Sequence, residues 1–95
     1  MTEGRESAAR WVVSGRVQGV GFRWFVVRKA GECAVTGWVR NLPNGSVEVA
    51  ARGTEAALGT LEHALRKGPA AANVESVEKS DIPPEQVPSK SFEIK

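Results

Sequence analysis

The pattern of apolar and polar residues predicts a strand followed by a helix in the first third of the chain. Over residues 11–17 apolar side chains alternate with others, which places Trp11, Val13 and Val17 on one face of a half-buried strand. From residue 22 the spacing becomes i, i+3, i+4, as on one face of a helix, with apolar residues at Phe22, Phe25, Val26, Ala30 and Cys33. Gly19 and Gly21 lie between the two patterns, so a glycine loop is expected to join strand and helix.

The middle of the chain predicts a hairpin and a second helix. Residues 35–41 and 47–51 alternate in polarity on either side of Leu42-Pro43-Asn44-Gly45, in which Asn-Gly favours a tight turn. Thr54 is the expected N-cap of the next helix. That helix should end at Gly68-Pro69 and bury three leucines, Leu58, Leu61 and Leu65.

Two further strands complete the pattern. Residues 74–79 and 91–94 are predicted strands, and the proline-rich stretch 82–88 between them is a predicted loop. The order β-α-β-β-α-β predicts an α+β fold, a ferredoxin-like sandwich in which two helices cover one face of an antiparallel sheet. Residues 1–10, which are small, polar or charged, are expected to form a flexible tail before a single domain at 11–95.

Composition limits the class of protein. The chain has 95 residues, of which 41% are hydrophobic and 25% charged, as in an ordinary globular domain. It has no apolar run of the ~20 residues that span a membrane and no secretory signal, so a cytoplasmic protein is expected. A single cysteine, Cys33, excludes an intrachain disulfide, and with only one histidine, His63, a metal centre is not expected.

The distribution of charge points to a small anion rather than a nucleic acid. The net charge is only +2. Residues 1–52 nevertheless carry eight Arg and Lys against four acids, and several of these basic residues fall between Arg16 and Arg40. Backbone amides of a glycine-rich loop and of a helix N-terminus converge on one point and favour an anion there.

Arg23 stands in the first turn of the predicted helix, where a cation opposes the helix dipole unless an anion lies between them. Its planar guanidinium can bind two phosphate oxygens at once. The same residues are equally compatible with an ordinary tight turn followed by a solvated arginine. Asn41, at the end of the second strand, could hold a water beside a bound phosphate, although an asparagine before a hairpin is more often a turn residue.

The chain strongly resembles acylphosphatase, the small enzyme that hydrolyses carboxyl-phosphate anhydrides. The resemblance covers about residues 10–95 and rests on Gly15-Arg16-Val17-Gln18-Gly19-Val20-Gly21-Phe22-Arg23, on Gly37-Trp38-Val39-Arg40-Asn41 and on Gly45-Ser46-Val47-Glu48-Val49. It implies a catalytic Arg23, a catalytic Asn41 and a phosphate-binding loop formed by Arg16, Val17, Gln18, Gly19, Val20 and Gly21. It further implies an acyl phosphate substrate, inorganic phosphate or similar anions at the loop, no cofactor, no metal, and a monomer that needs neither nucleic acid nor membrane.

Two other functions fit parts of the chain. The RNA-recognition module shares the element order, and residues 19–25 partly match its aromatic signature, but that signature belongs on a central strand rather than at helical spacing. Acylphosphatase-like domains also open the larger carbamoyl-transfer proteins of hydrogenase maturation. No residue follows Lys95 in this sequence, so a free-standing enzyme is expected.

Overall fold

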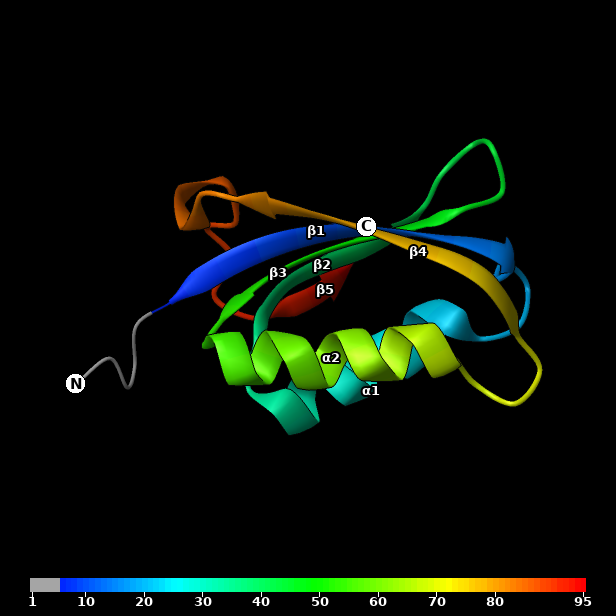
Figure 1. Cartoon of the computed structure of the whole chain (residues 1–95), viewed down its shortest axis with the longest axis horizontal. Coiled ribbons are helices and arrows are strands. Elements are labelled where there is room, and N and C mark those ends of the chain that lie inside the picture. The colour runs from blue at the N-terminus through cyan, green and yellow to red at the C-terminus, as the bar shows by residue number, and fades with distance from the viewer. Residues whose placement is uncertain (1–5) are drawn as a thin grey trace.

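A computed structural model describes residues 6–95 and confirms the predicted order of elements. The elements are β1 (Ser7–Arg16), α1 (Phe22–Cys33), β2 (Thr36–Asn41), β3 (Val47–Gly53), α2 (Glu55–Lys67), β4 (Asn73–Ile82), the short 3-10 helix η1 (Pro84–Gln86) and β5 (Phe92–Ile94). Both α-helices lie on the same face of one twisted sheet (Figure 1). The ferredoxin-like sandwich expected from the sequence is therefore the observed fold.

The sheet is mixed rather than wholly antiparallel. Its strand order is β4-β1-β3-β2-β5, and β1, β2, β3 and β4 pair antiparallel as predicted. The short strand β5 instead pairs parallel with β2, with Phe92 opposite Gly37. Prolines at 83, 84 and 88 cannot donate backbone hydrogen bonds, so the chain does not return directly beside β4. The chain instead reaches the opposite edge of the sheet. There it runs in the same direction as β2, so β5 and β2 pair parallel.

Strand β1 begins four residues earlier than the alternation predicted. Ser7, Ala8 and Ala9 pair with β3, and the two alanines are 3% and 1% exposed. The predicted tail over residues 1–10 is therefore wrong for Ser7–Arg10, because small alanines fit between neighbouring strands without a strong hydrophobic signal in the sequence. Residues 1–5 of that predicted tail lie outside the described residues.

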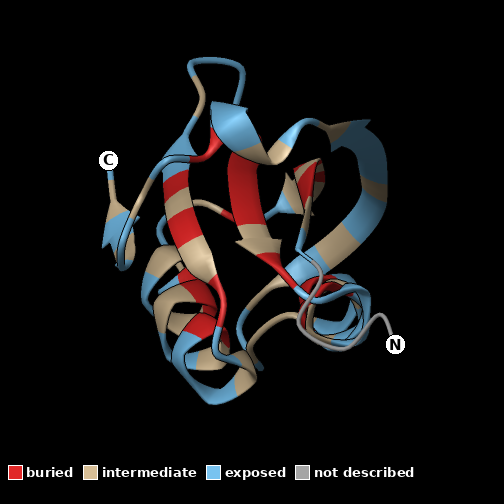
Figure 2. Cartoon of the chain, turned by 90° about the vertical axis from the view of Figure 1, so that its left-hand side faces the viewer, coloured by how far each residue is buried: buried red, intermediate tan, exposed pale blue. Residues whose placement is uncertain are grey.

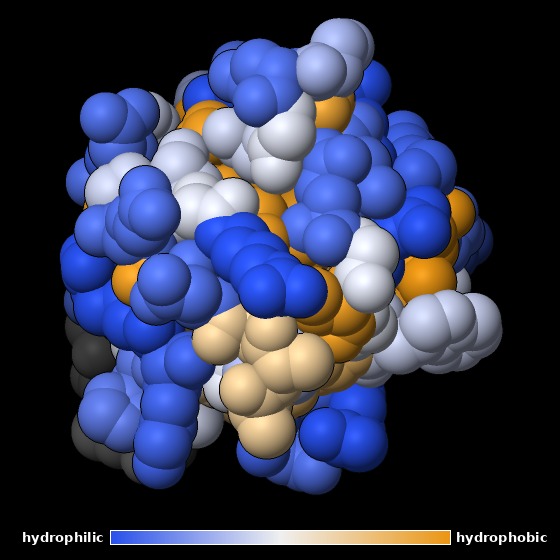
Figure 3. Space-filling model, turned by 90° about the vertical axis from the view of Figure 1, so that its right-hand side faces the viewer, coloured by the Kyte–Doolittle hydropathy of each residue, from blue (hydrophilic) through white to orange (hydrophobic). Residues whose placement is uncertain are grey.

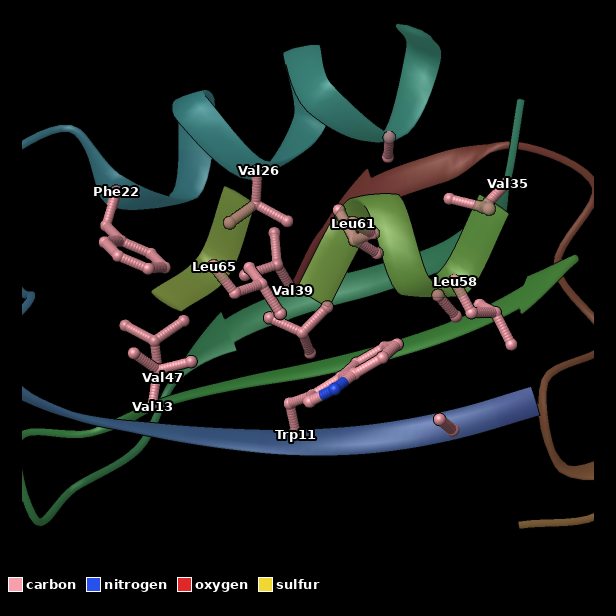
Figure 4. Close-up of a cluster of buried hydrophobic side chains, with 14 of the residues drawn as sticks. Trp11, Val13, Phe22, Val26, Val35, Val39, Val47, Leu58, Leu61 and Leu65 are labelled. Atoms are coloured by element: carbon pink, nitrogen blue, oxygen red, sulfur yellow. The ribbon is translucent and has the colours of Figure 1, made fainter. Parts of the chain in front are cut away.

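The main core lies between the helices and the sheet. Trp11, Val39 and Leu61 are fully buried in it, with Phe22 and Leu65 at the end of the core beside the glycine loop (Figure 4). Buried residues follow the central strands and the inner faces of the helices, whereas the edge strands are largely exposed (Figure 2). This core fixes the position of α1, and with it the loop that precedes α1.

The helix-free face of the sheet is partly covered at one end. Val87, from the segment after β4, is fully buried there against Ala8 and Ala50, and Trp38 packs on the same cluster. Further along this face, the carboxylate of Glu48 is buried and receives hydrogen bonds from the side chains of Arg10 and Arg40. Burial opposes ionisation of Glu48, but the two arginines outweigh it and lower its pKa.

Candidate functional site

The loop between β1 and α1 exposes its backbone. Gly19 and Gly21 adopt positive φ angles of 74° and 78°, which other residues rarely adopt. Both glycines are exposed, and a Cβ added to either would meet nothing within 4 Å. The amide groups of this loop are thus accessible to a small ligand from the solvent side.

Helix α1 begins at this loop without a side-chain cap. Its N-cap is Gly21, and no side chain among residues 6–95 accepts a hydrogen bond from its first turn. The hydrogen-bond ladder of the helix starts with the amide of Phe25, which donates to the carbonyl of Gly21 at 3.0 Å. The preceding amides, which lack intrahelical acceptors, and the positive end of the helix dipole therefore remain available to an anion.

Three other loop residues hold the loop in place. Val17 is 1% exposed, and Val20 packs against the core from a partly buried position. The side-chain amide of Gln18 donates to the carbonyl oxygens of Leu42 at 2.8 Å and Ser46 at 2.9 Å. Gln18 therefore connects the loop to the hairpin between β2 and β3. Sequence reasoning placed Gln18 in the loop but missed this role, because both carbonyls are distant in sequence.

Asn41 lies at the same end of the molecule. It is the last residue of β2, exposed, and two residues after the buried Val39, so its side chain leaves the sheet on the helix-covered face. The next residue, Leu42, accepts the hydrogen bond from Gln18. The loop and the hairpin, which are separate in sequence, both lie at the right-hand end of the view in Figure 1.

Arg16 and Arg23 lack carboxylate partners within the part of the chain that the structure describes. Six other basic residues do form ion pairs, namely Arg10, Lys29, Arg40, Arg52, Arg66 and Lys79. Arg16 ends β1 and is exposed, and Arg23 is half-buried in the first turn of α1, which contains no acid. Hydrophilic side chains surround apolar surface in the middle of this end of the molecule (Figure 3). Two cations without partners therefore flank the loop.

Cys33 and His63 lie elsewhere, in a groove of about 550 Å³ between α1 and α2 that includes none of the loop residues. Burial, and to a smaller extent Glu32, raises the pKa of the Cys33 thiol, while Lys29 partly offsets the effect, so this thiol is a poor nucleophile at neutral pH. His63 is exposed. Across residues 6–95 no three His, Cys, Asp or Glu side chains gather in a group that could hold a metal ion.

The geometry does not support the RNA-recognition alternative. Phe22 and Phe25 lie on α1, and Phe22 is buried in the core rather than displayed on a strand for base stacking.

None of the described helices is long and apolar enough to cross a membrane.

Comparisons with known proteins identify the family of the chain. The family model for acylphosphatase matches residues 9–94. An acylphosphatase from Koribacter versatilis is 50% identical over 94 residues, covering 99% of this chain and 84% of that relative. The structure of an acylphosphatase from Coxiella burnetii superposes with a TM-score of 0.88 at 38% identity and full coverage of both chains. T. kodakarensis HypF is also similar, with a TM-score of 0.81 at 37% identity, over 94% of this chain but 12% of that one. The chain belongs to the acylphosphatase family of hydrolases, which act on acid anhydrides.

Proposed function

We propose that this enzyme hydrolyses acyl phosphates at the loop of residues 16–21, with Arg23 binding the phosphoryl group and Asn41 orienting the attacking water. The observation that carries the proposal is the uncapped start of α1. It follows two open glycines and bears an arginine that has no carboxylate partner within residues 6–95. A helix start with free amides and an unpaired guanidinium has the chemistry of a phosphate site.

The reaction needs little beyond charge and position. Water attacks phosphorus, the bond between phosphorus and the acyl oxygen breaks, and that oxygen leaves with the electron pair as a carboxylate. A carboxylic acid has a pKa near ~4, so its carboxylate leaves without a general acid. One proton of the water passes to a phosphate oxygen of the substrate, which gives inorganic phosphate as the second product.

Arg23 and the loop amides would stabilise the charge on the phosphoryl oxygens of a loose transition state. An amide has no useful basicity, so Asn41 would act by holding the water in line with the bond that breaks. Gln18 supports both roles indirectly, because its hydrogen bonds fix the loop against the hairpin that begins one residue after Asn41. A cytoplasmic location and a monomeric state stay predictions.

The test is benzoyl phosphate hydrolysis, followed by ultraviolet absorbance with EDTA present. The wild type should turn over rapidly, and Asn41→Ala should lower kcat by ~10² or more while inorganic phosphate still inhibits. Asn73→Ala is the matched control, since Asn73 is an exposed asparagine on the edge strand β4. A folded wild type without activity would refute the proposed reaction. Loss of phosphate affinity alone in Asn41→Ala would refute the water-orienting role.

A further inference from the structure

Trp24 is unusual in this protein because it is a large apolar side chain in the solvent. It is 71% exposed and is the one exposed large hydrophobic residue among those described. The other two tryptophans pack, Trp11 in the main core and Trp38 on the smaller cluster of the helix-free face. The ring of Trp24 therefore contributes little to the stability of the fold. Its role is inferred from its position.

That position is the rim of the loop. Trp24 directly follows Arg23 in the first turn of α1, on the side away from the buried Phe22 and Val26. Side chains of a helix tilt toward its N-terminus and cover the surface one turn before their own Cα. From this geometry we expect the indole of Trp24 to lean toward residues 19–21, where Gly19 and Gly21 contribute no side chain that would occupy the space.

The loop amides and Arg23 provide polar contacts that suit a phosphoryl group rather than an apolar acyl group. Backbone amides and a guanidinium recognise phosphate oxygens alike in every acyl phosphate. An apolar or aromatic acyl group, by contrast, would extend from the loop into solvent unless a neighbouring side chain covered it. An indole at the rim presents a flat apolar surface of the kind that stacks on such a group.

Resting on the proposed function, we infer that Trp24 is a specificity-determining residue, which packs against the acyl group and favours aromatic acyl phosphates over small ones. It would touch the part of the substrate that leaves as the carboxylate. It takes no part in binding the phosphoryl group.

The experiment compares kcat/KM for benzoyl phosphate and acetyl phosphate in the wild type and in Trp24→Ala. Because each substrate is compared with itself across the two proteins, differences in intrinsic reactivity cancel. Trp24→Ala should lose about 3- to 10-fold on benzoyl phosphate, the size of one aromatic stacking contact, and less than about 2-fold on acetyl phosphate. Trp24→Phe should retain most of the preference, and inhibition by inorganic phosphate should be unchanged.

Arg28→Ala is the matched control, because Arg28 lies one turn further along α1 and is also exposed. It should leave both substrates unaffected. An equal loss on both substrates in Trp24→Ala, or no loss on either, would overturn the inference while leaving the reaction established. If the wild type hydrolysed neither substrate, the proposed function would fail, and the inference with it.

Discussion

The two helices pack side by side on one face of the sheet but begin and end differently (Figure 1). In α2 the hydroxyl of Thr54 accepts a hydrogen bond from the amide of Ala57 at 3.1 Å. Its first turn contains Glu55, and its last turn contains Arg66 and Lys67. All of these groups complement the helix dipole. Helix α1 has no acid in its first turn and no base in its last turn, and no side chain within residues 6–95 caps its start.

We interpret the capped start of α2 as a feature that stabilises the fold, and the uncapped start of α1 as part of the proposed binding site. The two helices have 12 and 13 residues, so length does not explain the difference. The hydroxyl of Thr54 caps the start of α2, whereas no side chain within residues 6–95 caps the start of α1. An uncapped helix start costs about 1 kcal/mol. A bound phosphate can offset that cost, so the helix start without a side-chain cap is the one proposed to bind substrate.

The largest effect is expected at Arg23. Arg23→Ala should lower kcat/KM for benzoyl phosphate by ~10³-fold or more, because an arginine that stabilises transferring phosphoryl charge contributes that much. Arg23→Lys should restore little, since an ammonium cannot bind two oxygens in the same plane. Arg66→Ala in α2 is the control, as Arg66 forms an exposed ion pair with Glu62 and should not affect turnover. Near-normal turnover by Arg23→Ala would remove its assigned role.

A smaller effect is expected when a glycine at each helix is changed to alanine. Gly21→Ala places a side chain at a φ of 78° and should cost about 1–2 kcal/mol of unfolding free energy, with a loss of activity as the loop shifts. Gly59→Ala, in the middle of α2, should instead stabilise the protein by about 0.5–1 kcal/mol, because helical backbone suits alanine and an added Cβ meets nothing within 4 Å. Urea unfolding measures both. A Gly21→Ala variant as stable as the wild type would contradict the left-handed turn assigned to Gly21, and a destabilised Gly59→Ala would contradict the prediction for α2.

The cap of α2 gives the third prediction. Thr54→Ala should lower the unfolding free energy by about 1 kcal/mol. It should leave kcat/KM unchanged, because α2 begins at the end of the molecule opposite the loop (Figure 1). Thr54→Ser should retain most of the stability, since it keeps the accepting hydroxyl. A clear loss of turnover in a folded Thr54→Ala variant would show that α2 and the loop are coupled, which the comparison of the two helices does not predict.

The contrast between local patterns and contacts between distant segments explains which features could be predicted from the sequence. Several features encoded by a local pattern were predicted correctly, including the Thr54 cap, the glycine loop and the helical face of α1. The predicted loop over 82–88 instead contains η1, and the strand predicted over 74–79 extends to Asn73–Ile82. The features missed depend on contacts between distant segments. Alanine at residues 8 and 9 carries too little hydrophobic signal to identify a strand until β3 is seen to pair with it.

The parallel pairing of β5 and the hydrogen bonds of Gln18 are missed for the same reason, because their partners are chosen by the tertiary fold. The register between Arg40 and Glu48 could have suggested the buried carboxylate, since a hairpin at Asn44-Gly45 places these two residues opposite each other. For the candidate site, the sequence pattern identified the glycine loop, Arg23 and Asn41 as candidates. The fold explains why the loop and Asn41 lie at the same end of the molecule.

The smallest effect is expected at Glu62, which ties α2 to the sheet. Its carboxylate accepts a hydrogen bond of 3.1 Å from the indole of the fully buried Trp11 and two from Arg66. The bond from Trp11 lowers the pKa of Glu62; partial burial opposes this, and Arg66 adds to the lowering. A carboxyl group with a lower pKa in the folded state stabilises the protein above its unfolded pKa. That stability is lost as the pH falls through the folded value.

Glu62→Gln keeps an oxygen for Trp11 but removes the charge. We expect it to reduce the unfolding free energy by at most about 1 kcal/mol at pH 7. The difference from wild type should then shrink below pH ~4, where Glu62 itself is protonated. Glu32→Gln is the counterpart on α1, because the one ion pair of Glu32 within residues 6–95 is with Lys29 on the surface, and it should change little at any pH. If the difference in unfolding free energy between wild type and Glu62→Gln stayed constant from pH 3 to 7, the charge of Glu62 would not contribute to stability. The contact between α2 and Trp11 would then depend on the shape of the side chain.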